Sequence, residues 1–335
     1  MNISVLGAGA WGTAVALHLS RMAEHRTTLV PRRIEQALTM ASTRENQEYL
    51  PGYTLGQDLQ IGCELKPALM EADVIVLACP SKGLRQLCEQ VKAELESSWR
   101  IKMVITLCKG LEQATLLKPA EVVAAILPEM QHAVLSGPTF AGEVAAGQPT
   151  AMVLASSGDD CLLREVQGAL NNDALRVYRT DDVVGVELGG CLKNVYAIGA
   201  GMCDGLKTGD NSKAAFLTRA MHEMVVIGQS QGARVETLYG LSGFGDLVAT
   251  CHGSWSRNRT FGEQLAGGIA VDDLLNNRKT VVEGYWATAC FHELCQKHAI
   301  EAPILNQIYA IAYEHKDPRQ SLQALMTRDL KAEGS

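Results

Sequence analysis

The sequence has no C-x-x-C pair and no cluster of cysteine and histidine residues with the spacing of a zinc site. Its ten cysteines are scattered along 335 residues. Zinc ligands and redox-active thiols usually lie close together in a sequence, so the common zinc and dithiol motifs are excluded. The pattern favours reduced, mostly buried thiols, which are typical of cytosolic proteins. We therefore expect no metal site and a cytoplasmic location.

The sequence also lacks a long apolar run and an excess of positive charge. A membrane-spanning helix needs about 18 or more consecutive apolar residues, and no such run is present. The N-terminus has no basic segment of the kind that begins a signal peptide. Lys and Arg together number 30 against 37 Asp and Glu, for a net charge of −7, which argues against a nucleic-acid surface. We expect no membrane span and no nucleic-acid partner.

Short apolar runs alternate with helix-length segments in the first half of the chain. Strands that are separated by helices indicate a parallel sheet with helices on both faces. We therefore expect an α/β fold there, a Rossmann-type, doubly wound and mostly parallel sheet. Residues 46–57 show no periodic pattern, and we expect an irregular insertion. The expected strands are residues 2–6, 27–30, 73–79, 102–108, 132–136, 151–156 and 175–179.

The strand pattern stops at residues 180–182, Thr-Asp-Asp, which is typical of a helix N-cap. A chain of this length exceeds what one hydrophobic core usually supports. We expect residues 1–182 to form one Rossmann-type domain around the sheet and residues 183–335 to form a second, all-α domain. The helical periodicity of the second half covers residues 183–204, 212–231, 260–267, 284–298 and 303–315.

Gly7, Gly9 and Gly12 directly follow the first expected strand and open the first expected helix. This is the G-x-G-x-x-G spacing of dinucleotide-binding sites, in the context that the motif requires. Gly7 permits a tight turn, Gly9 lets the backbone approach a pyrophosphate, and Gly12 lets helix and strand pack closely. The helix N-terminus offers free N–H groups to the anion. A glycine-rich turn without a ligand is the less favoured alternative.

Arg32 and Arg33 follow the second expected strand, where an NAD-preferring site usually has an acidic residue for the ribose. Guanidinium groups match phosphate with paired donors. The two arginines therefore indicate NADP(H), with NAD(H) as a second possible cofactor. The alternative is that they only solvate the start of a helix.

Other polar residues lie where ligands bind in such sheets, beyond the carboxyl ends of the strands. Lys109 directly follows a buried strand, and Gly137 and Thr139 lie in the segment SGPTFAGE. In the second half, Asp246 follows two glycines, and residues 256–259, Ser-Arg-Asn-Arg, gather donors that suit a phosphate monoester. The alternatives are that Lys109 is an exposed loop lysine, that Asp246 is a helix N-cap, and that residues 256–259 form a solvated loop.

Lys193 and Asn194 stand in the middle of an otherwise apolar helical segment. Gly189 and Gly190 lie one turn earlier on the same face, each at a cost of about 1 kcal/mol to the helix. We interpret the two glycines as room for a ligand or a nicotinamide ring. An ammonium group there can donate to a carbonyl oxygen as hydride arrives at its carbon. Lys193 is therefore the expected catalytic residue.

Seven segments resemble the NAD(P)-dependent glycerol-3-phosphate dehydrogenases of the bacterial soluble type. The resemblance covers about residues 2–330. It implies a Rossmann-type domain joined to a helical domain, a homodimer, and interconversion of dihydroxyacetone phosphate and sn-glycerol 3-phosphate with NADP(H) or NAD(H), which would supply glycerol phosphate for phospholipid synthesis. The segments are, in order, GAGAWGTA, CKGLE, LSGPTFAGEVAAG, GVELGGCLKNVYAIGAGMCDG, LSGFGDLVATC, SRNR and VVEG.

The resemblance also implies roles for residues at the matching positions. Lys193 would be the catalytic proton donor or acceptor, with Lys109 and Asp246 as catalytic partners. We add Asn194 as a catalytic helper because it adjoins Lys193 in the sequence. The substrate would contact Lys109, Gly137, Thr139, Lys193, Asp246, Ser256, Arg257 and Asn258. The cofactor would contact Ala10, Trp11, Arg32, Arg33, Lys109, Ala141, Arg257, Val281 and Glu283, together with Gly7, Gly9 and Gly12.

Two other functions stay open. A different two-domain reductase with a lysine in its helical domain, such as a ketopantoate reductase, would share the architecture, but its carboxylate substrate would not need the donors at residues 256–259. A non-catalytic NADP(H)-binding sensor could keep the glycine loop, but it would have no use for Lys193.

Overall fold

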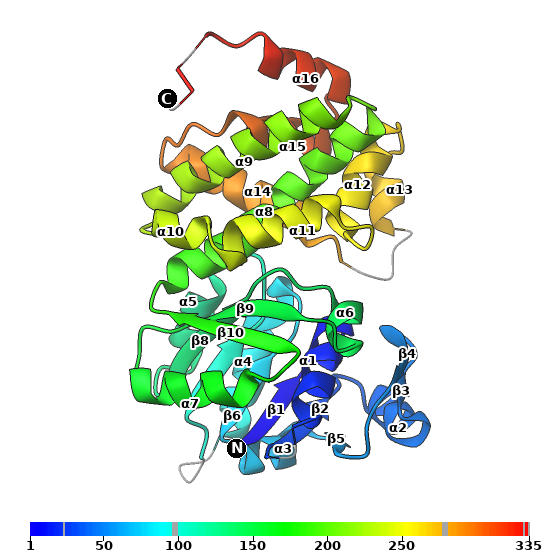
Figure 1. The fold of residues 1–335 in the computed structure, drawn as a ribbon, viewed down its shortest axis with the longest axis vertical. Coiled ribbons are helices and arrows are strands. Elements are labelled where there is room, and N and C mark those ends of the chain that lie inside the picture. Colours follow the sequence, from blue (N-terminus) through cyan, green and yellow to red (C-terminus); the bar gives the residue numbers. More distant parts are fainter. Residues whose placement is uncertain (23, 96–99, 277–280, 331, 334–335) are drawn as a thin grey trace.

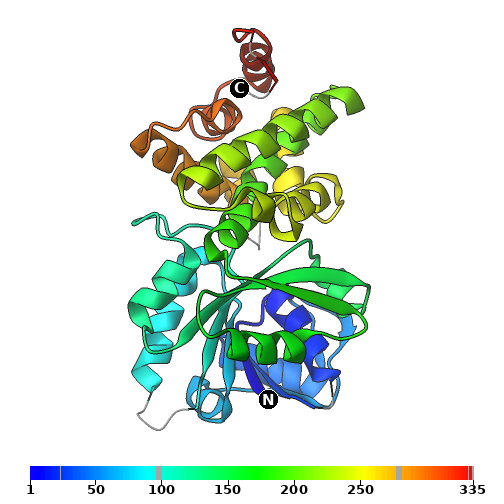
Figure 2. The ribbon, with the colours of Figure 1, turned by 60° about the vertical axis from the view of Figure 1, so that its left-hand side comes forward.

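The computed structural model of the chain describes residues 1–22, 24–95, 100–276, 281–330 and 332–333. It has two parts, one built on a β-sheet and one built of helices (Figures 1 and 2). The sheet part contains β1 (Asn2–Leu6), β2 (Arg26–Val30), β3 (Glu45–Asn46), β4 (Leu50–Thr54), β5 (Leu59–Ile61), β6 (Val74–Leu77), β7 (Met103–Thr106), β8 (Gln131–Ser136), β9 (Thr150–Ala155) and β10 (Leu175–Thr180).

In the described part of the chain, eight strands form one sheet in the order β10-β9-β8-β7-β6-β1-β2-β5. All neighbours in it are parallel except β8 and β9. The central strands β6 and β7 are buried throughout, because helices cover both faces, and this explains their continuous apolar sequence. The expected fold class, a mostly parallel Rossmann-type sheet followed by helices, is confirmed.

Helices of the sheet part connect most of the strands. The helix after β1 is the one that the glycine loop opens, and several others match the expected helical segments to within a few residues. They are α1 (Ala10–Ser20), α2 (Ile34–Thr43), α3 (Leu65–Glu71), α4 (Leu84–Glu94), α5 (Pro119–Ile126), α6 (Ala141–Ala145) and α7 (Asp160–Leu170), with a short 3-10 turn η1 (Ser81–Gly83).

The expectation of an irregular insertion at residues 46–57 is wrong. β3 and β4 form an antiparallel hairpin there, separate from the main sheet. The strands are too short to show a period in the sequence, and long-range contacts hold them. The buried amide of Asn46 donates to the carbonyl of Ala8 at 3.0 Å and to the hydroxyl of Thr13 at 2.7 Å. These two hydrogen bonds hold the hairpin against the glycine loop and the first turn of α1.

The helical part is organised around α8 (Val183–Gly205), which leads out of the sheet part in Figure 1. Asp182 caps its N-terminus, as expected, by accepting a bond from the N–H of Gly185 at 2.8 Å. The other elements are α9 (Asp210–Ser230), α10 (Val235–Leu238), the π-helical turn η2 (Leu241–Gly245), α11 (Asp246–His252), α12 (Arg257–Ala266), α13 (Val271–Asn276), α14 (Glu283–Lys297), α15 (Pro303–Tyr313) and α16 (Pro318–Met326).

Helices α8 and α12 approach each other closely at two glycines. A Cβ at Gly201 would lie 1.9 Å from the carbonyl oxygen of Arg259, and one at Gly262 would lie 1.9 Å from that of Ile198. No side chain fits at either position, so the backbones themselves are in contact. This crossing brings the start of α12 against the middle of α8. Within the described residues, no helix is long and apolar enough to cross a membrane.

Candidate functional site

The glycine loop has the geometry that its motif predicts. Gly7 has a positive φ of 113°, and a Cβ there would lie 2.4 Å from the carbonyl oxygen of Ala78. A Cβ at Gly12 would lie 2.1 Å from the carbonyl oxygen of Gly7. A Cβ at Gly9, by contrast, would meet no atom within 4 Å. Gly7 and Gly12 are thus required because neighbouring backbone atoms leave no room for a side chain. Gly9 instead leaves open space beside the N-terminus of α1, where a pyrophosphate fits.

Three residues expected at the cofactor gather beside this loop. Ala10 and Trp11 in the first turn of α1 pack with Ala141, the first residue of α6, in one apolar cluster. The indole Nε1 of Trp11 is buried and has no hydrogen-bond partner among the described residues. An unpaired buried donor of this kind is costly, which is consistent with a partner supplied by a ligand.

The two arginines after β2 differ in their surroundings. Both are exposed, but the guanidinium of Arg33 forms an ion pair with Glu48, in the turn of the β3–β4 hairpin. Arg32 has no such pair within the described part of the chain. Arg32 is therefore the more available donor for a 2′-phosphate, and Arg33 would have to leave Glu48 to join it.

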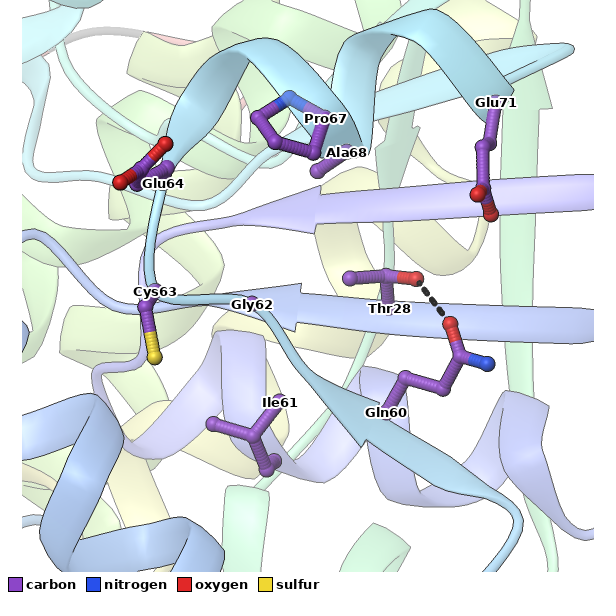
Figure 3. Close-up of a pocket in the computed structure, with 9 residues that line it drawn as sticks. All are labelled: Thr28, Gln60, Ile61, Gly62, Cys63, Glu64, Pro67, Ala68 and Glu71. Carbon is purple, nitrogen blue, oxygen red and sulfur yellow. Dashed lines mark hydrogen bonds between the residues drawn. The ribbon is translucent and has the colours of Figure 1, made fainter.

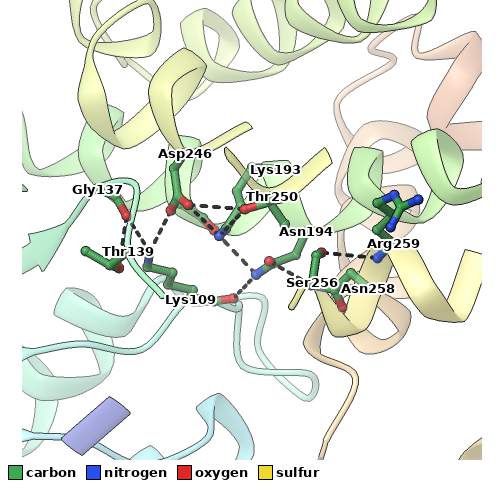
Figure 4. Close-up of polar contacts among 11 residues, drawn as sticks. Lys109, Gly137, Thr139, Lys193, Asn194, Asp246, Thr250, Ser256, Asn258 and Arg259 are labelled. Carbon is green, nitrogen blue, oxygen red and sulfur yellow. Dashed lines mark hydrogen bonds and ion pairs between the residues drawn. The ribbon is translucent and has the colours of Figure 1, made fainter. Parts of the chain in front are cut away.

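The centre of the site is one carboxylate between two lysines (Figure 4). Lys193 Nζ lies 2.7 Å from Asp246 Oδ1, and Lys109 Nζ lies 2.6 Å from Oδ2. Asp246, on α11, is 1% exposed and Lys193, on α8, is 7% exposed. Lys109 comes from the loop after β7, so this ion pair joins the sheet part to the helical part. The three groups carry one net positive charge, which suits an anionic ligand or a developing oxyanion.

Burial and charge act against each other on the pKa values here. Burial lowers the pKa of Lys193 to about 8, although the adjacent Asp246 carboxylate opposes this and the Lys109 ammonium adds to it. Burial alone would raise the pKa of Asp246, but the two ammonium groups together lower it. The carboxylate therefore stays ionised near neutral pH, while Lys193 can exchange a proton there.

Thr250 belongs to this centre and was missed by sequence reasoning. Its hydroxyl accepts a hydrogen bond from Lys193 Nζ at 2.7 Å and lies 3.2 Å from Asp246 Oδ1. Thr250 follows Asp246 by four residues in α11, so the two side chains share one face of the helix. The spacing of four residues was the sign of this in the sequence. It could be interpreted only once the structure showed that Lys193 faces both side chains.

The interpretation of Gly189 and Gly190 as room for a ligand is wrong. A Cβ at Gly189 would lie 2.8 Å from the carbonyl oxygen of Ser242, and one at Gly190 would lie 2.7 Å from the hydroxyl oxygen of Ser136. The glycines let the turn before α11 and the end of β8 pack directly on α8. Their role is to bring the segment that carries Asp246 close to Lys193.

Asn194 bonds to groups beside the centre and not to the ammonium group of Lys193. Its amide donates to the carbonyl of Lys109 at 3.3 Å and accepts from the amide of Asn258 at 2.8 Å. The side-chain oxygen of Asn258 accepts in turn from the N–H of Gly284 at 3.0 Å. This chain of amides joins α8, α12 and the start of α14, and it fixes the rotamers of both asparagines.

The donors of residues 256–259 divide into three environments. The buried hydroxyl of Ser256 caps α12 by accepting from the N–H of Arg259 at 3.2 Å. The guanidinium of Arg259 forms an ion pair with Asp204 at 2.6 Å. Arg257, in the first turn of α12, is exposed, so a ligand can reach it from solution.

Gly137 and Thr139 lie beside Lys109, as Figure 4 shows. The carbonyl of Gly137 accepts bonds from Lys109 Nζ at 3.1 Å and from the Thr139 hydroxyl at 3.2 Å. Gly137 has a φ of 152°, and a Cβ there would lie 3.0 Å from the backbone of β9. The loop after β8 therefore holds the Lys109 ammonium from one side while Asp246 holds it from the other.

Glu283 joins the two parts of the molecule at a second point. Its carboxylate accepts from the Ser81 hydroxyl at 2.7 Å, and Val281 lies two residues before it, partly buried. The described residues include no group of three His, Cys, Asp or Glu side chains that could hold a metal ion. A pocket against β5 and α3, shown in Figure 3, contains none of the residues expected at the site.

The fold and this site define a class: two-domain proteins in which a dinucleotide-binding sheet and a helical domain share one polar centre. Family models described as the N-terminus and the C-terminus of NAD-dependent glycerol-3-phosphate dehydrogenase match residues 2–162 and 182–323. The chain belongs to the NAD-dependent glycerol-3-phosphate dehydrogenase family.

Individual relatives are similar over nearly the whole chain. The glycerol-3-phosphate dehydrogenase [NAD(P)+] of Syntrophotalea carbinolica is 43% identical over 99% of this chain and 99% of its own. The crystal structure of glycerol-3-phosphate dehydrogenase from Coxiella burnetii has a TM-score of 0.91 at 38% identity, over 98% of this chain and 99% of that one. A ketopantoate reductase from Ralstonia eutropha has a TM-score of 0.61 at 17% identity, over 96% of this chain and 100% of that one, which is a likeness of fold alone.

Proposed function

We propose that the protein interconverts dihydroxyacetone phosphate and sn-glycerol 3-phosphate with NADP(H), and with NAD(H) as a second cofactor. The observation that carries the proposal is the buried Lys193, which shares the Asp246 carboxylate with Lys109. Family membership supports the substrate and the cofactor. The open space beside Gly9 and the unpaired indole of Trp11 fit a dinucleotide.

The nicotinamide cofactor, when bound, supplies hydride to the carbonyl carbon of the substrate. Lys193 donates a proton to the carbonyl oxygen as negative charge develops on it. Asp246 and Thr250 each accept a bond from the ammonium group and so fix its direction. Lys109 keeps Asp246 ionised. In the oxidation direction, neutral Lys193 takes the proton from the C2 hydroxyl.

We propose that Gly137, Thr139, Ser256, Arg257 and Asn258 surround the substrate, with Arg257 on its phosphate, and that Asn194 positions Lys109 and Asn258. The cofactor site is proposed to comprise Gly7, Gly9, Ala10, Trp11, Gly12, Arg32, Arg33, Lys109, Ala141, Arg257, Val281 and Glu283.

We further propose a cytoplasmic homodimer that supplies glycerol phosphate for phospholipid synthesis, with residue 182 as the boundary between the dinucleotide-binding domain and the helical domain. The start of α8 at Val183, directly after the last strand, supports the boundary. Light scattering of the purified chain tests the dimer, and a single-chain mass would overturn it.

The substrate phosphate is the sharpest test of the function. NADPH oxidation is measured with dihydroxyacetone phosphate, dihydroxyacetone, ketopantoate and oxaloacetate. We expect turnover of the first and a loss of several powers of ten in kcat/KM without the phosphate, because its binding energy orients the carbonyl. Turnover of ketopantoate alone would establish the rival reductase, and no turnover with any compound would favour the sensor.

Arg257→Ala then locates the phosphate. It should lower kcat/KM for dihydroxyacetone phosphate by a factor that corresponds to about 2–4 kcal/mol, because it leaves the charge of the substrate phosphate unpaired. It should change kcat/KM for dihydroxyacetone far less. Arg319→Ala, which removes another exposed arginine from α16, is the control. An equal loss with both substrates would assign Arg257 to the cofactor or to the fold.

A further inference from the structure

Two cysteines lie side by side just beyond the carboxyl ends of two central strands, where the proposed cofactor and substrate meet. Cys79 follows β6 and Cys108 follows β7. The two strands pair in parallel with Leu77 opposite Thr106, so Cys79 stands opposite Cys108. Their sulfur atoms are 3.9 Å apart, and the Cys108 thiol also donates to the Cys79 carbonyl at 3.0 Å.

The usual spacing of adjacent strands suits a disulfide between residues that stand opposite each other. Adjacent strands lie about 4.7–4.9 Å apart, and the Cα atoms of a disulfide lie about 4.4–6.8 Å apart. Cys79 and Cys108 each lie two residues beyond the last paired residues of β6 and β7. The loops that carry them can therefore close the remaining gap between the sulfur atoms while the paired strands stay in place. This pair is invisible in the sequence, where 28 residues separate the two cysteines.

The two thiols differ in access. Cys79 is partly exposed, whereas Cys108 is buried. The hydrogen bond to Cys79 and burial raise the pKa of Cys108 well above its usual value, so Cys108 stays a thiol until a partner sulfur is activated. A small oxidant from solution would therefore reach Cys79 first.

We propose that Cys79 and Cys108 form a reversible disulfide that switches the enzyme off, an inference that rests on the proposed function for its effect on activity. With a peroxide as oxidant, the Cys79 sulfur attacks the O–O bond, becomes a sulfenic acid and releases water. The Cys108 sulfur then displaces a second water from it and forms the S–S bond. The two thiols lose two electrons and two protons, and the peroxide becomes two waters. A dithiol reductant reverses the change.

The disulfide would disturb both halves of the site. The sulfur atoms must move from 3.9 Å to about 2.05 Å, and the bond from Cys108 to the Cys79 carbonyl is lost. Cys108 directly precedes Lys109, which holds Asp246. Cys79 lies on the backbone that packs under Gly7, since a Cβ on that glycine would be 3.6 Å from the Cys79 nitrogen.

Neighbouring groups leave little room to absorb such a movement. Two residues after Cys79, the hydroxyl of Ser81 holds Glu283 at 2.7 Å. Two residues after Cys108, a Cβ at Gly110 would lie 2.7 Å from that same Ser81 hydroxyl oxygen. The loops after β6 and β7 are thus in contact, and a shift in one is passed to the other.

The test begins with the full-length protein, kept reduced and then treated with hydrogen peroxide. Trypsin does not cut before proline, so the Lys66–Pro67 bond stays intact and Cys63 shares a peptide with Cys79. The mapping is therefore done on Cys63→Ser, in which cleavage at Lys82, Lys92 and Lys102 places Cys79, Cys88 and Cys108 in three different peptides. We expect non-reducing peptide mapping to find the Cys79 and Cys108 peptides linked. A link of either peptide to Cys88, or no link while other thiols are oxidised, would overturn the proposal.

Activity is measured on the same samples. We expect loss of at least about tenfold in turnover on oxidation, since displacements of about 1 Å at positioning groups commonly cost up to about 100-fold, and full recovery with dithiothreitol. Cys79→Ser and Cys108→Ala should each be active before oxidation and resist peroxide. Cys63→Ser and Cys161→Ser, at two exposed thiols, should be inactivated like the unaltered protein.

The two proposals fail in different ways. A reduced protein that turns over none of the substrates overturns the proposed function, while the mapped disulfide is still observed. NADPH binding, followed by its fluorescence, then reports whether the disulfide alters the cofactor site. A disulfide that forms and leaves both turnover and NADPH binding unchanged would overturn the switch.

Discussion

The ammonium group of Lys193 and the carboxylate of Asp246 are in contact at 2.7 Å, and both are buried. A buried ion pair of this kind usually adds little to stability, because desolvation of the charges cancels much of their attraction. Hydrophobic residues of similar size would serve the fold as well. A role in catalysis therefore explains the pair better than a role in stability.

Replacement of Lys193 by Met removes the ammonium group at nearly constant length. If that group stabilises developing charge, kcat should fall by about 100-fold or more, which is about 3 kcal/mol. NADPH binding should hardly change, because Asp246 keeps Lys109 as its partner. Steady-state kinetics and fluorescence titration measure the two effects. Lys316→Met, which removes a lysine bonded to Gln307, is the control, and near-normal turnover of Lys193→Met would make that lysine structural.

The pH dependence should differ between the two directions of the reaction. Burial lowers the pKa of Lys193 to about 8, so the proton donor is present below that pH and is lost above it. The kcat of reduction should therefore fall above about pH 8, by about tenfold per pH unit. The kcat of oxidation, which needs the neutral amine, should rise towards pH 8. Parallel profiles for both directions would contradict the assignment.

The choice of cofactor should depend on the residues after β2. Neutral replacements of both Arg32 and Arg33 should lower the ratio of kcat/KM for NADPH over NADH by about tenfold or more, since about 1.4 kcal/mol is tenfold and a charged hydrogen bond is worth that much. Glu48→Gln, which releases Arg33 from its ion pair, should not lower the ratio. An unchanged ratio in the double variant would place the 2′-phosphate elsewhere.

Glu187 should make the protein less stable as the pH rises from about 4.5 to 8. It is buried on α8, with one oxygen bonded to the N–H of Ala120 at 2.6 Å and the other without a partner among the described residues. Burial raises its pKa to about 8, although the Ala120 N–H and Lys118 oppose this. Between the two pKa values the folded state keeps a proton that the unfolded state releases, so stability falls there.

Glu187→Gln removes that dependence, because its amide oxygen can still accept from Ala120. At pH 8 the variant should be more stable by about 1–3 kcal/mol, as one pKa unit is worth about 1.4 kcal/mol. Urea unfolding at several pH values measures this. Glu129→Gln, at an exposed glutamate, is the control. A Gln variant with the same pH slope as the unaltered protein would show that Glu187 does not titrate.

Local patterns in the sequence were enough for the fold class and for most elements. Apolar runs of about five residues predicted the central strands, because a strand buried on both faces needs little else. The spacing of Gly7, Gly9 and Gly12 predicted the loop at the end of β1, because the motif lies directly between a strand pattern and a helix pattern. The β3–β4 hairpin was missed, because contacts such as that of Asn46 with Ala8 lie outside any local pattern.

The sequence by itself also determined which residue types were available for the site: two lysines, an aspartate and an arginine at positions that interrupt apolar or glycine-rich segments. Only the tertiary structure decided how they meet. Lys109 and Asp246 are 137 residues apart and bond at 2.6 Å, and Thr250 joins them only because α11 packs on α8. Gly189 and Gly190 looked like space for a ligand, and the fold uses them for close contact. Such contacts depend on the crossing of distant elements, and no local spacing encodes that crossing.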